Sequence, residues 1–187
     1  MEVSMGSFEF GFWALVALAA AFLIYRGVLA SRTWLEFRGE RLVTCPETRH
    51  AAAVSVAAGK AAKAAFQHAP ALQLKECSRW PERADCGQDC LSQIEADPAG
   101  CLVWNIVNDW YAGKACAFCK KPFGQINWHD HRPALLDRDR QTVQWTDVPP
   151  EKLPEIFETH LPVCWDCHIA ESFRRQHPEL VTNRPPH

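Results

Sequence analysis

An uncharged apolar run near the N-terminus restricts this chain more than any other feature of its sequence. From Phe10 to Tyr25 the chain reads FGFWALVALAAAFLIY, and residues 27–30 continue the run after Arg26. As a helix the uninterrupted run spans roughly 24 Å and the extended run roughly 31 Å, against about 30 Å for a bilayer's hydrocarbon core. Arg26 can extend its guanidinium to the headgroups. We therefore assign residues 1–31 to a transmembrane anchor.

The charges on either side of this run predict its orientation. Two acidic residues precede the run and four arginines follow it: Glu2, Glu9, Arg26, Arg32, Arg38 and Arg41. Because basic residues favour the cytoplasmic side, we expect the folded part in the cytoplasm, on a single-pass protein of a bacterial-type inner membrane. Cleavage of a signal peptide before Ser31 is the alternative, but the acidic start is atypical of signal peptides.

The size and charge of the chain limit the fold and the partners of the part after the anchor. The 187 residues leave room for one ordinary domain or two small ones, and exclude a large enzyme core. With 20 Lys and Arg against 22 Asp and Glu, the chain has no overall basic field. The net charge gives no support for nucleic acid as a partner, although it does not exclude one. The predicted partners are the membrane and another protein.

The remainder divides into a polar linker over residues 32–44, a cysteine-containing α+β region over 45–112 and a metal-binding region over 113–187. Periodicity and turn residues predict short strands at 52–56, 72–75, 124–128 and 142–145. They predict helices at 57–68, from Asp97 to Gly113, and at 164–176. The expected fold class is α+β.

Two Cys-x-x-Cys pairs dominate the last region: Cys116 with Cys119, and Cys164 with Cys167. Two such pairs supply the four thiolates of a closed tetrahedral zinc site. The first pair leads into the turn residues 120–124, and the second opens a predicted helix, whose N-terminus favours thiolate. We predict a structural zinc, the staple that a small irregular domain needs.

A cysteine pair in a tight turn, followed later by a cysteine pair at the start of a helix, resembles the treble-clef zinc finger. With Asp130-His131 between the pairs and His168 after the second, residues 113–177 are similar to the HNH nucleases, whose ββα-metal core is a treble-clef relative. The resemblance implies that His131 is a general base, and that Asp130 and His168 hold a catalytic divalent cation. No Asn lies between His131 and Cys164, where the family places the residue that orients its base. We therefore expect a binding or assembly module without catalytic activity, with a nuclease as the alternative.

The sequence Cys164-Trp-Asp-Cys167-His168 is also the attachment motif of c-type haem. A membrane-anchored c-type cytochrome is thus a second alternative. Haem attachment takes place outside the cytoplasm, however, and it leaves Cys116 and Cys119 without a role. Zinc remains the preferred cofactor.

Five of the nine cysteines lie outside the two pairs. Cys45, Cys77, Cys86 and Cys90 could form a second site, for zinc or an iron–sulfur cluster, which would not include Cys101. Their spacing matches no established pattern, so the second metal stays open. The complete prediction is a transmembrane helix followed by a small zinc-stabilised α+β domain with a treble-clef C-terminal half.

Overall fold

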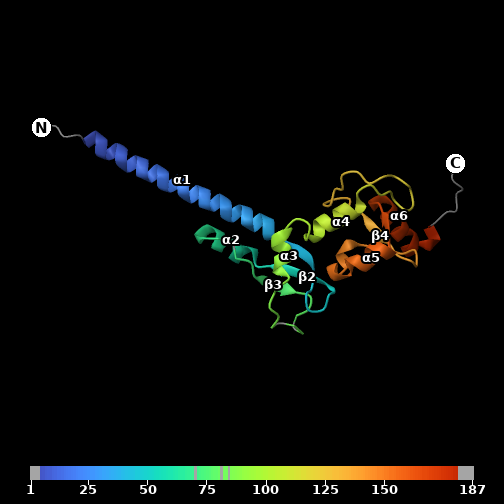
Figure 1. The fold of residues 1–187 in the computed structure, drawn as a ribbon. Coiled ribbons are helices and arrows are strands. Elements are labelled where there is room, and N and C mark those ends of the chain that lie inside the picture. Colours follow the sequence, from blue (N-terminus) through green and yellow to red (C-terminus); the bar gives the residue numbers. More distant parts are fainter. Residues whose placement is uncertain (1–4, 70, 81, 84, 181–187) are drawn as a thin grey trace. The chain divides into compact units, whose positions relative to one another are not determined.

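The computed structural model describes residues 5–69, 71–80, 82–83 and 85–180 of the chain (Figure 1). It confirms an α+β protein that begins with an apolar helix. Residues 1–4 of the predicted anchor and 181–187 of the predicted metal-binding region lie outside the described residues. The chain forms two compact units, Met1–Glu40 with Val54–Pro98 and Arg41–Ala53 with Ala99–His187.

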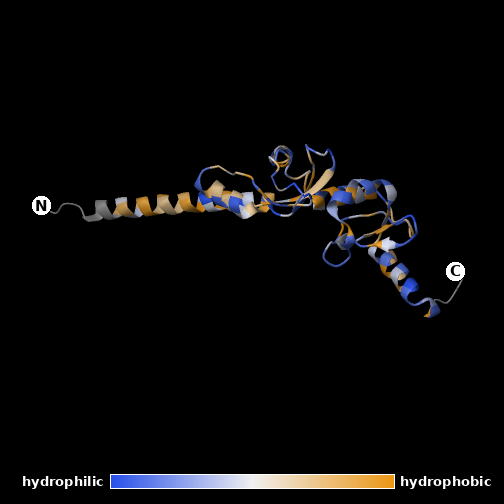
Figure 2. Ribbon diagram, turned by 90° about the horizontal axis from the view of Figure 1, so that it is seen from below, coloured by the Kyte–Doolittle hydropathy of each residue, from blue (hydrophilic) through white to orange (hydrophobic). Residues whose placement is uncertain are grey.

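The first unit begins with α1, Met5–Phe37. Side chains from Phe10 to Tyr25 are all exposed, and the ribbon there is predominantly apolar (Figure 2). Within Phe10–Phe37, an 18-residue window has a mean hydropathy of 2.0, and by length and composition the helix could cross a membrane. Residues 32–37 continue the helix into the range expected to be a linker, because no proline interrupts them and the first breaker is Gly39, with φ of +94°.

Helix α2, Ala58–Gln67, lies beside the C-terminal part of α1 in the same unit (Figures 1 and 2). It buries a stripe of small side chains: Ala58, Ala61 and Ala65. On α1, Leu29 and Ala30 are half-buried and Thr33 is buried. Small side chains on one face let two helices approach closely, and this alanine-rich segment is helical as its composition predicts.

Strand β3, Leu74–Cys77, pairs antiparallel with the end of β2, Ala51–Val56, and Val54 lies opposite Cys77. The strand predicted at 52–56 is confirmed, whereas the one predicted at 72–75 begins two residues later. A short helix that the sequence analysis did not predict, α3, spans Leu91–Ala96 and buries Ile94 completely.

In the second unit, β1 (Glu40–Thr44) leads through a tight turn to the start of β2. The predicted helix from Asp97 is α4, Val103–Tyr111, and the predicted start is wrong. Residues 98–101 form turns instead, and Leu102 makes a β-bridge with Arg41. The predicted stop is correct, because Gly113 has a φ of +72°, which ordinary side chains avoid.

A second small sheet carries the end of the chain. Its order is β5-β4-β6, all antiparallel, with β4 at Ala134–Leu136, β5 at Thr142–Val143 and β6 at Leu161–Val163. Helix α5, Leu153–Thr159, precedes β6, and α6, Trp165–Gln176, follows it as predicted. The strand predicted at 124–128 is wrong, because this segment runs without sheet pairing into a turn at residues 128–130.

Tyr111 is the centre of the aromatic core of this unit and is completely buried. Its hydroxyl donates a hydrogen bond to the Ala134 carbonyl at 2.7 Å and accepts one from Trp145 Nε1 at 3.0 Å. Burial raises the pKa of Tyr111, so the hydroxyl remains a neutral donor. The hydroxyl therefore links α4, β4 and the segment after β5.

We expect Tyr111→Phe to destabilise the protein by about 1–3 kcal/mol, because it leaves a buried carbonyl and a partly buried indole N–H without a partner. Urea unfolding followed by tryptophan fluorescence measures the loss. Tyr25→Phe is the matched control, since Tyr25 is 60% exposed on α1. Equal midpoints for the two variants would contradict this role of the hydroxyl.

Candidate metal centre

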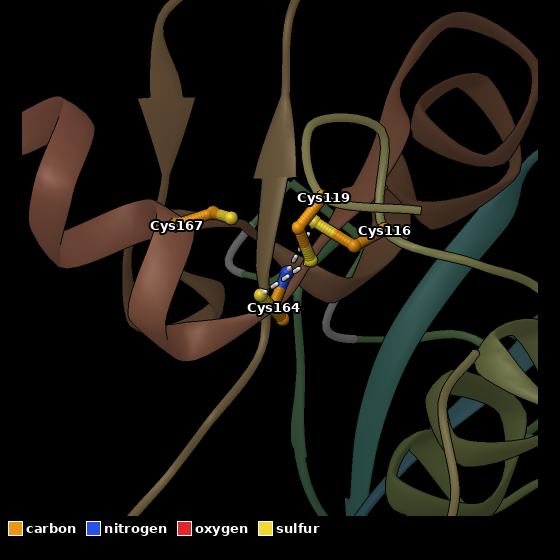
Figure 3. Close-up of side chains that lie close together, drawn as sticks. All are labelled: Cys116, Cys119, Cys164 and Cys167. Carbon is orange, nitrogen blue, oxygen red and sulfur yellow. Dashed lines mark hydrogen bonds between the residues drawn. The ribbon is translucent and has the colours of Figure 1, made fainter. Parts of the chain in front are cut away.

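Four cysteine sulfurs gather at the junction of a loop and a helix in the second unit. The sulfurs of Cys116, Cys119, Cys164 and Cys167 all lie within 4.8 Å of one another. Figure 3 shows one pair approaching from the loop before β4 and the other from the start of α6, with the side chains converging. The structure thus brings together the two pairs singled out by their spacing.

The first pair lies in a tight hairpin. Cys116 N–H donates to the Lys121 carbonyl at 2.9 Å, and Lys120 N–H donates to the Cys116 carbonyl at 3.0 Å. Lys120 turns the chain with a φ of +61°, a left-handed conformation uncommon for a residue with a side chain. Ala115 and Pro122 close the hairpin with a β-bridge. Both thiols of this pair are therefore held on one short, defined turn.

The second pair is positioned by β6 and α6. Cys164 is the N-cap of α6, with extended backbone angles, and Cys167 lies in the first turn of the helix. Strand β6 also fixes the hairpin, because Ala117 N–H donates to the Pro162 carbonyl at 2.8 Å. Cys164 N–H donates directly to Cys116 Sγ at 3.3 Å (Figure 3). The two halves of the site are thus joined by backbone hydrogen bonds as well as by their sulfurs.

The surroundings favour the thiolate of Cys116 and oppose the thiolates of Cys164 and Cys167. Burial resists ionisation of Cys116, but backbone N–H donors from Cys164, Cys119 and Phe118 outweigh it and lower its pKa to about 7. Burial raises the pKa of Cys164 and of Cys167. A cation among the sulfurs would reverse this balance, because a coordinating thiol is deprotonated by the metal.

The sulfur spacing fits a bound ion better than a disulfide. Cys119 Sγ and Cys164 Sγ are 3.7 Å apart, whereas a disulfide requires about 2.05 Å. Four sulfurs at about 2.3 Å from one zinc ion lie about 3.8 Å apart in a regular tetrahedron. Because a set of four cysteines suits zinc or iron, the site is a candidate metal centre whose ion remains to be identified.

Among the described residues, those implied by the nuclease resemblance form no metal site of their own. His131 follows a turn in which the Asn127 carboxamide accepts the backbone N–H groups of His129 and Asp130, and donates to the Asp130 carboxylate at 3.1 Å. His168, in α6, is only 3% exposed. Burial, and then the charge of Arg175, lower the pKa of His168, which favours the neutral imidazole. Their catalytic roles stay predictions.

Within the described part of the chain, the second cysteine set forms no comparable group. Cys45 belongs to the second unit, whereas Cys77, Cys86 and Cys90 belong to the first. A second metal there therefore also stays a prediction.

The turn at Cys45 repeats the hydrogen bonds of the Cys116 hairpin. Cys45 N–H donates to the His50 carbonyl at 2.9 Å, Arg49 N–H donates to the Cys45 carbonyl at 2.8 Å, and Arg49 has a φ of +57°. The Thr48 hydroxyl, with the N–H groups of Thr48 and Glu47, lowers the pKa of Cys45. Thr48 occupies the position that Cys119 has in the Cys116 hairpin. The turn at Cys45 can therefore provide one sulfur ligand where the Cys116 hairpin provides two. This similarity was not predicted from the sequence, although in each turn the left-handed residue lies four positions after the cysteine.

No family model matches this chain, and neither a curated protein nor a solved structure matches it. The chemistry assigned to the site therefore rests on its own geometry.

Proposed function

We propose that this chain is a single-pass membrane-anchored protein whose second unit is held by a structural zinc ion, and that it serves as a binding or assembly module. The observation that supports the zinc is the convergence of four sulfurs within 4.8 Å. The apolar, exposed run of α1 supports the anchor. The treble-clef description of the C-terminal half is part of this proposal.

The ligand set favours a structural over a catalytic role for the metal. Catalytic zinc keeps one position open for water or substrate, whereas four cysteines close the coordination sphere. The site also belongs to a small core in which Cys116 and Val163 are fully buried beside Ala134 and Leu136. A metal there connects the hairpin, the second sheet and α6.

Elemental analysis of the purified full-length chain tests this assignment. We expect at least one zinc per chain after extraction in mild detergent, and a spectrum without visible absorption. A chain that purifies folded with no bound metal would overturn the proposal. A covalent haem band would favour the c-type cytochrome, in which Cys164 and Cys167 form thioether bonds instead.

The turn at Cys45 supports a second metal as part of the same proposal. Its hydrogen bonds match those of the Cys116 hairpin and favour a thiolate. A second metal, zinc or an iron–sulfur cluster held by Cys45 with Cys77, Cys86 and Cys90, is a prediction from the sequence, and these cysteines belong to two different units. If that metal is bound, Cys45→Ser lowers the metal content of the chain without removing the first zinc.

The proposed orientation places the folded part of the chain after the anchor in the cytoplasm. The arginines that follow the apolar run carry this expectation, in particular Arg32 and Arg38, because basic flanks remain inside. A reporter active only in the cytoplasm, fused after His187, should be active, and its counterpart active only in the periplasm should be silent. The reverse pattern, or cleavage before Ser31, would contradict this orientation.

We expect no nuclease activity, because the nuclease resemblance lacks the Asn that orients the base and Asp130 is engaged by Asn127. The purified chain should leave DNA intact in Mg²⁺ or Mn²⁺. His131→Ala should retain the zinc and nearly all the stability, since losing one exposed contact costs at most about 1 kcal/mol. Metal-dependent cleavage that disappears in both His131→Ala and His168→Ala, at unchanged zinc content, would establish the nuclease instead.

A further inference from the structure

The C-terminal end of α2 lies at the point on α1 where the uncharged run stops. Arg26, the first charged residue after that run, donates from Nε to the Phe66 carbonyl at 2.6 Å and from Nη2 to the Ala65 carbonyl at 3.0 Å. The last turn of α2 is therefore tied to the level at which α1 would leave the hydrocarbon layer.

These hydrogen bonds satisfy carbonyls that a helix end normally leaves to water. The last carbonyls of a helix have no partner within it, and such a group costs most where water is scarce. Here the Ala64 carbonyl accepts a hydrogen bond from His68 N–H at 2.7 Å. The next two carbonyls, those of Ala65 and Phe66, accept hydrogen bonds from the Arg26 guanidinium. The guanidinium also stabilises the negative end of the helix dipole. This helix end is thus suited to a place with little water.

The surface of the same turn has the composition of a membrane interface. Phe66 is 40% exposed although it is aromatic, and Tyr25 on α1 is 60% exposed. Lys63 is exposed and lies one helical turn before Phe66, on the same face of α2. Aromatic rings concentrate at the headgroup level, and lysines there attract anionic lipids.

We propose that the last turn of α2 rests in the headgroup layer of the bilayer, with Phe66 at the boundary of the acyl chains and Lys63 beside anionic lipid phosphates. The inference depends on the proposed membrane anchor and goes beyond it. It assigns α2 a lipid-binding surface and gives Arg26 the role of holding that surface at a fixed depth.

Photo-crosslinking tests the placement in the full-length chain. Benzoylphenylalanine replaces one phenylalanine at a time, at positions 22, 66 and 173, in vesicles of phosphatidylcholine and phosphatidylglycerol. All three native side chains are substantially exposed, at 61%, 40% and 49%. We expect the yields of lipid adduct at positions 22 and 66 to agree within about threefold. At position 173 the yield should not exceed the background. Adding Arg26→Met should reduce the adduct at position 66 several-fold and leave position 22 unchanged.

Each outcome separates the two proposals. Lipid adducts at position 22 with background at position 66 would overturn the interfacial placement and retain the anchor. Background at position 22 as well would overturn both. An undiminished adduct at position 66 in the Arg26→Met background would overturn the role of the arginine.

Discussion

Cys116→Ser and Cys164→Ser should each release the proposed zinc ion and unfold the end of the second unit. Structural zinc contributes apparent binding free energies of about 10–16 kcal/mol in zinc-finger peptides, which exceeds the total stability of most domains. Both residues also take part in the hydrogen bond between the two halves of the site. We expect loss of the cooperative thermal transition, measured by circular dichroism, together with loss of bound metal. A strong chelator should have the same effect on the parent chain.

Cys101→Ser is the matched control for these variants, because Cys101 is half-buried in the same unit but belongs to neither predicted metal site. It should retain its zinc and a transition close to that of the parent. If the Cys116 and Cys164 variants melt like this control, the cluster is a group of ordinary thiols and the central proposal fails.

Charging the apolar run should remove the protein from the membrane. Leu15 and Leu18 are both 68% exposed on α1. Exchanging a leucine for an arginine near the centre of a spanning helix costs about 3 kcal/mol on the insertion scale, so the double variant loses about 6 kcal/mol. We expect Leu15→Arg with Leu18→Arg to shift the chain from the membrane fraction to the soluble or degraded fraction.

Leu35→Arg provides the comparison in the same helix. Leu35 is 53% exposed but lies beyond the apolar run, where a charge contacts water. This variant should remain in the membrane fraction after carbonate extraction. Full membrane retention of the double variant would mean that α1 does not span the bilayer.

The features that the sequence analysis anticipated depend on local patterns. The apolar run, the alanine-rich α2 and the helix at Cys164 all have a periodicity or a cap that can be read within one segment. The two cysteine pairs are also local, and their spacing is typical of a four-thiolate metal site, which predicts that they converge. The α+β class and the four candidate ligands were therefore within reach of the sequence.

The features that were missed depend on contacts between distant segments. Strands β4 and β6 have three residues each, which is too few to show an alternating pattern. They form because they pair with each other, although α5 and other segments separate them in the sequence. Residues 124–128 have the aromatic and branched side chains of a strand, but they provide Ile126 and Trp128 to the core around Tyr111. Asn127 then bonds the backbone locally, which competes with sheet pairing.

The division of the cysteine ligands between a hairpin and the start of α6 sets an order of events during synthesis. Chains emerge N-terminus first, so α1 leaves the ribosome long before Cys164 and Cys167 do. In the proposed arrangement the anchor is already inserted when the fourth sulfur becomes available. In that arrangement the proposed metal centre would be completed beside the bilayer, and its metal would be supplied at the membrane surface.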